Sequence, residues 1–183
     1  MMTVDRVGVE RAIRLLLMCI GEDDLREGLR ETPVRLARFW KEFIDYDPGK
    51  VDVTFSSVET DQMVVVKDIR VYSLCEHHLL PMILDVNIGY ITRDKVLGLS
   101  KLARIAHKHA HRLQIQERLT RDIAYEVGRL ANTKDVAVLI EGTHLCMQMR
   151  GIRSSGTMIT STLMGTFKDK PACRAEFLTL IGR

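Results

Sequence analysis

The chain has 183 residues, of which 46% are apolar and 28% charged, and its formal net charge is only +3. These values are typical of one globular domain, or of one domain with a helical appendage, and give no support to general nucleic-acid or membrane-surface binding. Four cysteines are too few for a disulfide scaffold, and the N-terminal segment lacks the parts of a signal peptide, so we expect a cytoplasmic protein.

The N-terminal quarter of the sequence predicts two helices. Residues 5–20 carry apolar side chains at helical spacing, and Gly21 follows as a typical C-terminal stop. A second helix is expected to begin with Thr32 as N-cap and Pro33 in the first turn, and to end near residue 44. The turn at 45–50 then separates a helical extension, residues 1–48, from the main domain, residues 49–183.

Beyond this turn the apolar period changes from helical to two. Strands are predicted at 63–75 and 84–92, followed by helices from Ser100, a possible N-cap, to 113 and from 119 to 130. Two more strands, 136–149 and 158–167, and a short closing helix at 171–181 complete the order. Strands and helices in separate runs favour an α+β fold, with an antiparallel ββααββ sheet and the helices on one face.

The segment CEHH places Cys75 and His78 at the Cys-x-x-His spacing of half a zinc site. Alternation along the predicted strand 136–149 sends His144 and Cys146 to one side, with Arg150 in the same phase. Cys75, His78 and Cys146 would form a Cys₂His set that leaves a fourth position for water, the pattern of catalytic zinc. Spacing alone equally allows a core thiol at Cys146 and a histidine pair in a loop.

Basic residues cluster near the same elements. Lys101 and Arg104 lie at the start of a predicted helix, and Arg150 and Arg153 follow the strand of Cys146. A helix N-terminus together with such side chains favours a phosphate group. A solvated charged face is the alternative.

Two polar motifs on the predicted helices also have ordinary structural explanations. Glu117, which follows Gln116 at a helix start, either satisfies the helix dipole or accepts hydrogen bonds from the donor edge of a guanine. His107 and His111 have the i, i+4 spacing of a metal pair, but no carboxylate adjoins them. We expect the latter to form an exposed or subunit-lining patch.

Five motifs in the same order resemble GTP cyclohydrolase I of the zinc-dependent type: SLCEHHLLP, GLSKLARI, RLQIQERLTRDIA, EGTHLCMQMRGI and TSTLMGTF. The resemblance runs from about residue 27 to 180. It implies a tunnelling fold of two strands, two helices and two strands with an N-terminal helical extension. It also implies a homodecamer of two stacked pentamers with active sites between subunits, and GTP as substrate; neither nucleic acid nor a membrane is expected as partner.

The resemblance also implies residue roles. Cys75, His78 and Cys146 would hold Zn²⁺, His77 and His144 would be catalytic histidines, and Ser100 would lie beside the ribose. Substrate contacts are implied for seven residues: Gln116 and Glu117 at the guanine, Lys101, Arg104 and Arg150 at the triphosphate, and Arg35 and Arg38 from a neighbouring subunit.

The implied reaction hydrolyses the imidazole ring of GTP at C8, releases formate and rearranges to 7,8-dihydroneopterin triphosphate, the first step of pterin and folate synthesis. Zinc lowers the pKa of bound water from about 15.7 towards 7, which supplies a nucleophile at neutral pH. His77 is suited to shuttle protons, because an unperturbed imidazole pKa of about 6.5 permits both protonation states. His144 is expected either to orient water or to transfer a proton.

Some positions depart from the family pattern, notably Asp85 and Thr92 in the segment 82–94 and Gly142, where Ala is frequent.

Three other functions are less well supported by the sequence. Purine or pterin binding without turnover is disfavoured by the retained His77 and His144 and the complete Cys₂His set. A structural zinc module on nucleic acid is disfavoured by the missing fourth ligand and the small net charge. A reductase of the same fold, acting on a 7-deazaguanine nitrile, would need a free cysteine nucleophile and lacks the CEHH and THLC pair.

Overall fold

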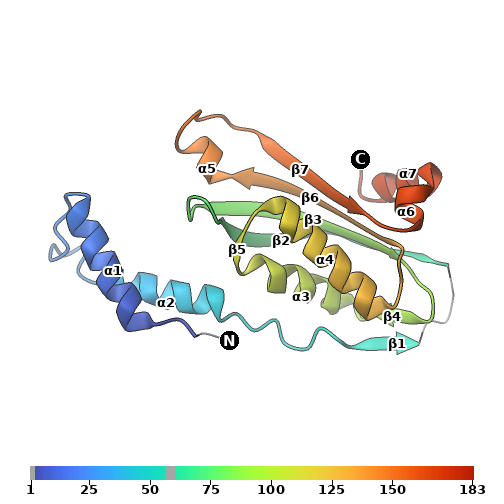
Figure 1. Cartoon of the computed structure of the whole chain (residues 1–183), viewed down its shortest axis with the longest axis horizontal. Helices are drawn as coiled ribbons and strands as arrows, with labels where there is room; N and C mark the ends of the chain where they lie inside the picture. The colour runs from blue at the N-terminus through green and yellow to red at the C-terminus, as the bar shows by residue number, and fades with distance from the viewer. Residues whose placement is uncertain (1–2, 57–60) are drawn as a thin grey trace. The chain divides into compact units, whose positions relative to one another are not determined.

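The computed structural model describes residues 3–56 and 61–183 (Figure 1). The chain divides into two compact units, Met1–Asp47 and Pro48–Arg183. Among the helices of the described residues, none combines the length and the apolar character that a membrane crossing requires.

The first unit is a pair of helices, α1 (Arg6–Cys19) and α2 (Thr32–Ile44), as the sequence predicts. The Asp5 carboxylate caps α1 by accepting the Gly8 N–H at 3.0 Å. Buried side chains lie on both helices, which pack against each other: Leu17, Pro33, Ala37 and Phe43. Thr32 is not the cap that was predicted, because it is already helical and Glu31 occupies the N-cap position.

The second unit is built on a five-stranded sheet of order β5-β2-β3-β6-β7. The four long strands pair antiparallel: β2 (Met63–Cys75), β3 (Pro81–Ile91), β6 (Val136–His144) and β7 (Thr157–Leu163). The two-residue strand β5 (Leu113–Gln114) adds a parallel pairing at the end of β2 that the sequence did not predict. A separate two-stranded sheet joins β1 (Thr54–Ser56) to β4 (Lys95–Leu97).

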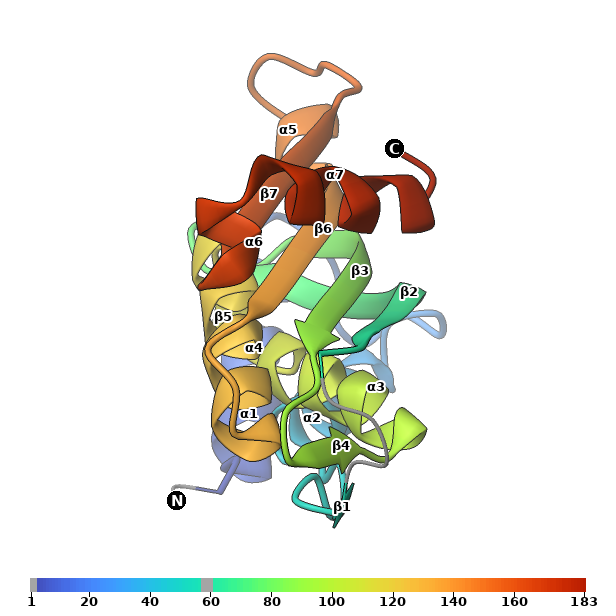
Figure 2. The same ribbon diagram turned by 90° about the vertical axis from the view of Figure 1, so that its right-hand side faces the viewer.

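Two helices, α3 (Leu99–Ala110) and α4 (Gln116–Ala131), cover one face of this sheet (Figure 2). The main core lies between the two layers and contains buried side chains from both: Val86, Ile88, Val138 and Ile140 from the strands, and Leu102, Ile105, Leu119 and Ile123 from the helices. The predicted α+β class and the ββααββ order of the tunnelling fold are therefore confirmed. Ser100 is not the predicted cap, since α3 begins at Leu99 and Gly98 is its N-cap.

The opposite face is covered at one end by α6 (Thr166–Asp169) and α7 (Pro171–Leu180). Residues of β6 alternate between the faces, so that Ala137 and Leu139 join Phe167 and Phe177 in a second buried cluster. Gly89 permits this packing, because a Cβ there would lie 2.7 Å from Cδ2 of Phe177. The one-face arrangement of helices thus holds for α3 and α4 but not for the C-terminal helices.

The predicted strand 136–149 is too long. β6 ends at His144, and the short helix α5 (Leu145–Gln148) follows. The ladder with β3 ends at the pair of Met82 and His144, next to Pro81, which has no N–H to extend the pairing. Cys146 therefore lies on a helical turn. The prediction that Cys146 and His144 share one side of a strand is wrong, because the strand ends at His144.

Candidate metal centre and substrate cavity

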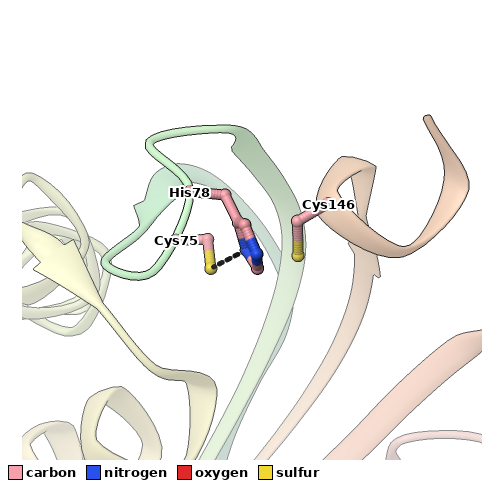
Figure 3. A group of neighbouring side chains, drawn as sticks. All are labelled: Cys75, His78 and Cys146. Carbon is pink, nitrogen blue, oxygen red and sulfur yellow. Dashed lines mark hydrogen bonds between the residues drawn. The ribbon is translucent and has the colours of Figure 1, made fainter. Parts of the chain in front are cut away.

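The side chains of Cys75, His78 and Cys146 converge from three chain segments (Figure 3). Cys75 ends β2, His78 lies in the following loop, and Cys146 lies on α5. Their ligand atoms all lie within 4.8 Å of one another, and Cys75 Sγ is 3.8 Å from His78 Nδ1. Two thiols and one imidazole are a donor set that suits zinc and leaves a coordination position for another ligand. Within residues 3–56 and 61–183, no other group of His, Cys, Asp and Glu side chains is as well placed for a metal ion.

A tight loop between β2 and β3 fixes the first two members of this group. The Cys75 carbonyl accepts the N–H of Leu79 at 2.8 Å, and the Cys75 N–H donates to the Leu80 carbonyl at 2.9 Å. Leu79 has a φ of 57°, a left-handed conformation that residues other than glycine rarely adopt. The loop therefore turns sharply enough to present His77 and His78 directly beside Cys75.

The thiols have an electrostatic environment that a cation would change. Burial, followed by the neighbouring Cys75 thiol, raises the pKa of Cys146 above its ordinary value. Without a cation the thiol of Cys146 is therefore neutral near pH 7, and metal binding must release its proton.

The Arg150 guanidinium contacts His78 Nε2, which places this predicted triphosphate ligand at the edge of the metal group.

A cavity of about 300 Å³ opens beside the metal group, a volume at the lower end of those that hold small ligands. Its lining includes all three metal-group residues together with His77, Glu117 and His144. Glu117 is in the first turn of α4, where the helix dipole favours a carboxylate. One cavity thus combines a metal-ligand set, two imidazoles and an acceptor for N–H groups of a ligand.

His144 is hydrogen-bonded to Gln116. The distance from His144 Nε2 to Gln116 Oε1 is 2.8 Å. Burial lowers the pKa of His144, and the charge of Glu117 opposes this effect in part. The prediction that Gln116 contacts a guanine stays a prediction, but within this subunit its side-chain amide is directed at protein groups.

The three predicted site residues on α3 do not line the cavity. Ser100 and Lys101 are in the first turn of α3, and Arg104 follows one turn later, where its guanidinium contacts the Pro48 carbonyl. The other end of α3 leads into β5, which pairs with Cys75. A helix of 12 residues is about 18 Å long, so one subunit holds these side chains away from the metal group.

Two further predicted site residues belong to the first unit. Arg35 and Arg38 are exposed on α2. Their basic side chains are therefore open to a ligand or to another chain, and their contribution to a site stays a prediction.

The structure adds residues that the sequence analysis missed. Arg118 on α4 donates two hydrogen bonds to Glu76, although the two residues are 42 positions apart. Gln114 and Met158 line the cavity from β5 and β7. Glu76 lies within the CEHH motif, so its position was visible, but only the sheet and helix packing shows its partner.

Residues of the histidine run 107–111 make contacts within the layer formed by α3 and α4. His109 Nε2 lies 2.5 Å from the Glu126 carboxylate, and Lys108 Nζ lies 2.6 Å from the same group. His111 Nδ1 lies 2.8 Å from the His107 carbonyl. His107, His109 and His111 are half-buried within this subunit, so the expected exposed patch is not found, and a subunit-lining role stays a prediction.

Comparison with known proteins gives a consistent result. The family model described as GTP cyclohydrolase I matches residues 9–182. A GTP cyclohydrolase 1 from Sulfurihydrogenibium sp. is 47% identical, covering 98% of this chain and 97% of the relative. A GTP cyclohydrolase 1 from Hyperthermus butylicus is 43% identical, covering 98% of this chain and 93% of the relative. Among solved structures, the archaeosine synthase QueF-Like in the apo form matches with 18% identity and a TM-score of 0.43, over 57% of this chain and 96% of that one.

Proposed function

The chain belongs to the GTP cyclohydrolase I family, whose members convert GTP to 7,8-dihydroneopterin triphosphate at the start of pterin and folate synthesis, and we propose that it does so with zinc. Cys75, His78 and Cys146 would hold the metal. The supporting observation is that these three ligand atoms lie within 4.8 Å of one another at the wall of a cavity that also contains Glu117 and His144. Zinc bound by such a set supplies a Lewis acid that activates water near neutral pH.

The carboxylate of Glu117 is proposed to recognise the base. A guanine presents two neighbouring N–H donors, at N1 and at the 2-amino group, and an ionised carboxylate accepts both. Glu117 is exposed and lines the cavity at the start of a helix, where the helix dipole favours a carboxylate. This contact would orient the imidazole ring of GTP towards the metal group.

The two imidazoles that line the cavity are proposed to handle protons during ring hydrolysis. His77 is an exposed side chain on the same loop as His78. His144 is half-buried, and its Nε2 is hydrogen-bonded to the side chain of Gln116. An exposed and a sheltered imidazole are suited, respectively, to exchange protons with solvent and to hold one in a fixed direction.

We also propose that the complete site combines subunits of a decamer of two stacked pentamers. Ser100, Lys101 and Arg104 lie away from the cavity of their own subunit, so a neighbouring copy is needed to bring them to the ribose and triphosphate. β7 is the last strand in the sheet order of the described residues, which leaves its outer edge open to another copy. Arg35 and Arg38 would come from a neighbouring subunit as well, and the free thiols suit a cytoplasmic enzyme.

The proposed function is tested by incubating the zinc-loaded protein with GTP. Formate release and the fluorescence of the oxidised pterin should rise together. Absence of formate from protein with one zinc per chain would refute the proposed activity. Removal of zinc with a chelator should abolish turnover, and re-addition should restore it; full turnover by zinc-free protein would refute the metal requirement.

A further inference from the structure

The side-chain amide of Gln116 is held in one orientation. Its Nε2 lies 3.0 Å from the carbonyl oxygen of Ile140 and 3.1 Å from that of Met158. Both carbonyls can only accept hydrogen bonds, so the NH₂ group must face them. The alternative assignment, with nitrogen and oxygen exchanged, would set three acceptors against one another in a place where Gln116 is only 1% exposed.

This orientation of the Gln116 amide determines which ring nitrogen of His144 carries a hydrogen. The Gln116 Oε1 atom, which only accepts, lies 2.8 Å from His144 Nε2, so this ring nitrogen must carry a hydrogen. We propose that Gln116 is a positioning residue that fixes the Nε2–H tautomer of His144, in which Nδ1 is the hydrogen-bond acceptor. This inference rests on the proposed function and deepens it.

Gly142 provides the room that this arrangement needs. It faces Leu84 on β3 and Met158 on β7 in the sheet ladders. A Cβ at position 142 would overlap Oε1 of Gln116 and also crowd Cδ2 of Leu84. The glycine, which stands where the family often has Ala, therefore lets the amide lie close against β6 while it holds His144.

The same contacts argue against a direct role of Gln116 in gripping the base. Its NH₂ group has two hydrogens and faces three acceptors, the two carbonyls and Thr160 Oγ1 at 3.1 Å. A bond from this NH₂ group to guanine would have to displace one of these contacts in the protein interior, with loss of a hydrogen bond that the fold already makes. Positioning requires no such loss.

The test is a comparison of steady-state kinetics in zinc-loaded enzyme. Gln116→Met keeps the side-chain volume but removes the acceptor, so kcat should fall by about 10-fold to 1,000-fold while KM for GTP stays within about twofold. In a His144→Ala background the same substitution should cause no further loss, because the two residues act as one unit. Thr160→Val is the matched control: it removes a partner of the amide nitrogen, leaves the His144 contact in place, and should keep kcat within about twofold.

Two kinetic outcomes would overturn the proposal. A raised KM with unchanged kcat would show that Gln116 contacts the substrate, and equal losses in both backgrounds would show that it acts apart from His144. A second measurement requires neither a folded Gln116→Met variant nor turnover of GTP. Nitrogen-15 NMR of histidine-labelled wild-type protein, assigned with His144→Asn, should show the hydrogen of neutral His144 on Nε2; a hydrogen on Nδ1 overturns the proposal whatever the activity.

Discussion

Glu76 and Arg118 form a two-bond ion pair that ties the loop of the metal group to helix α4. The two guanidinium nitrogens lie 2.7 and 3.0 Å from the two carboxylate oxygens. The hydrogen bond from Arg118 holds the pKa of Glu76 below its ordinary value. Glu76 stands between Cys75 and His78 in sequence, and Arg118 follows Glu117, so the pair couples the candidate metal ligands to the candidate base-recognising carboxylate.

Loss of this pair should loosen the metal group without unfolding the protein. In Arg118→Met the loop after Cys75 loses its anchor to α4, and we expect zinc to dissociate several-fold faster, because groups behind metal ligands tune affinity by about 10-fold to 100-fold. The pair is partly exposed, so Tm should change little. Zinc transfer to a chromogenic chelator measures the rate.

The matched control for this variant is Arg121→Met. Arg121 lies on the same helix, and its guanidinium bonds to the neighbouring Asp122. Zinc release at the wild-type rate is expected there. Equal rates in Arg118→Met and wild type would show that the ion pair does not support the metal group.

Cys146 should be required for tight zinc binding. Replacing it by Ser removes a thiolate from a three-residue set, and we expect the zinc affinity to fall by more than about 100-fold, since even indirect partners of metal sites cost 10-fold to 100-fold. Metal content after dialysis, measured by atomic absorption, checks this. Cys173→Ser is the control, because that thiol packs against the second buried cluster and should leave one zinc per chain.

Sequence patterns predicted the elements that carry a strong period. The helices α1, α2 and α4 and the strand β2 were predicted because each carries several apolar residues at the spacing of its element. The two-residue strand β5 was not, since a pairing between Gln114 and Cys75 leaves no periodic trace in so short a segment. The helical turn at Leu145–Gln148 was missed for a related reason: its residues continue the apolar alternation of β6, and only the end of the partner strand stops the ladder.

The sequence predicted which residues belong to the candidate site better than it predicted how they are arranged in space. The CEHH spacing indicated Cys75 and His78, and strand alternation offered Cys146 as a third ligand without deciding between a ligand and a core thiol, because contacts between distant segments cannot be deduced from one sequence. The motif resemblance then favoured the ligand. The place of Lys101 shows the opposite limit. The motif groups it with the site, whereas within one subunit it stands at the far end of α3.

Glu117 should determine the preference for a guanine base. Glu117→Ala removes the acceptor for two N–H groups, and KM for GTP should rise by about 10-fold to 100-fold, the range for hydrogen bonds to a charged group. Wild-type enzyme should prefer GTP to inosine triphosphate, which lacks the 2-amino group, and the variant should lose most of that preference. An unchanged KM in Glu117→Ala would remove the residue from base recognition.

Asp135 should make stability depend on pH in the acid range. Burial alone would raise the pKa of this carboxyl, but the Thr166 N–H at 2.7 Å and the Arg93 guanidinium at 2.6 Å outweigh it and lower the pKa below the ordinary 3.8. Since the folded-state pKa is lower than the unfolded one, the stabilisation is present above about pH 4 and is lost as pH falls through the folded value.

Asp135→Asn tests this contribution. The variant should lower the free energy of unfolding by about 1–3 kcal/mol at pH 7, and its difference from wild type should shrink below about pH 4. Urea unfolding at several pH values measures both. The exposed Asp94→Asn should show no comparable loss, and a constant Asp135→Asn difference from pH 7 to pH 3 would contradict the assigned ionic role.

Activity should be recoverable from two inactive variants if the site combines subunits. Lys101→Ala keeps the metal group and His144 but lacks the proposed triphosphate contact, whereas His144→Ala keeps Lys101. In a randomly mixed oligomer, roughly a quarter of the sites would draw an intact His144 from one copy and an intact Lys101 from its neighbour. Co-expressed subunits with different tags, purified on both tags, should therefore show about a quarter of wild-type kcat per site.

The control mixture pairs His144→Ala with Cys146→Ser. Both substitutions affect the same cavity within one subunit, so no neighbour can supply a complete set, and activity should stay at the level of the separate variants. The contrast matters because mixing also changes protein stability and expression, which would affect both mixtures alike. If the Lys101→Ala and His144→Ala mixture is as inactive as its components, the basic residues of α3 do not serve a neighbouring cavity. Their distance from the metal group in one subunit would then exclude them from the reaction altogether.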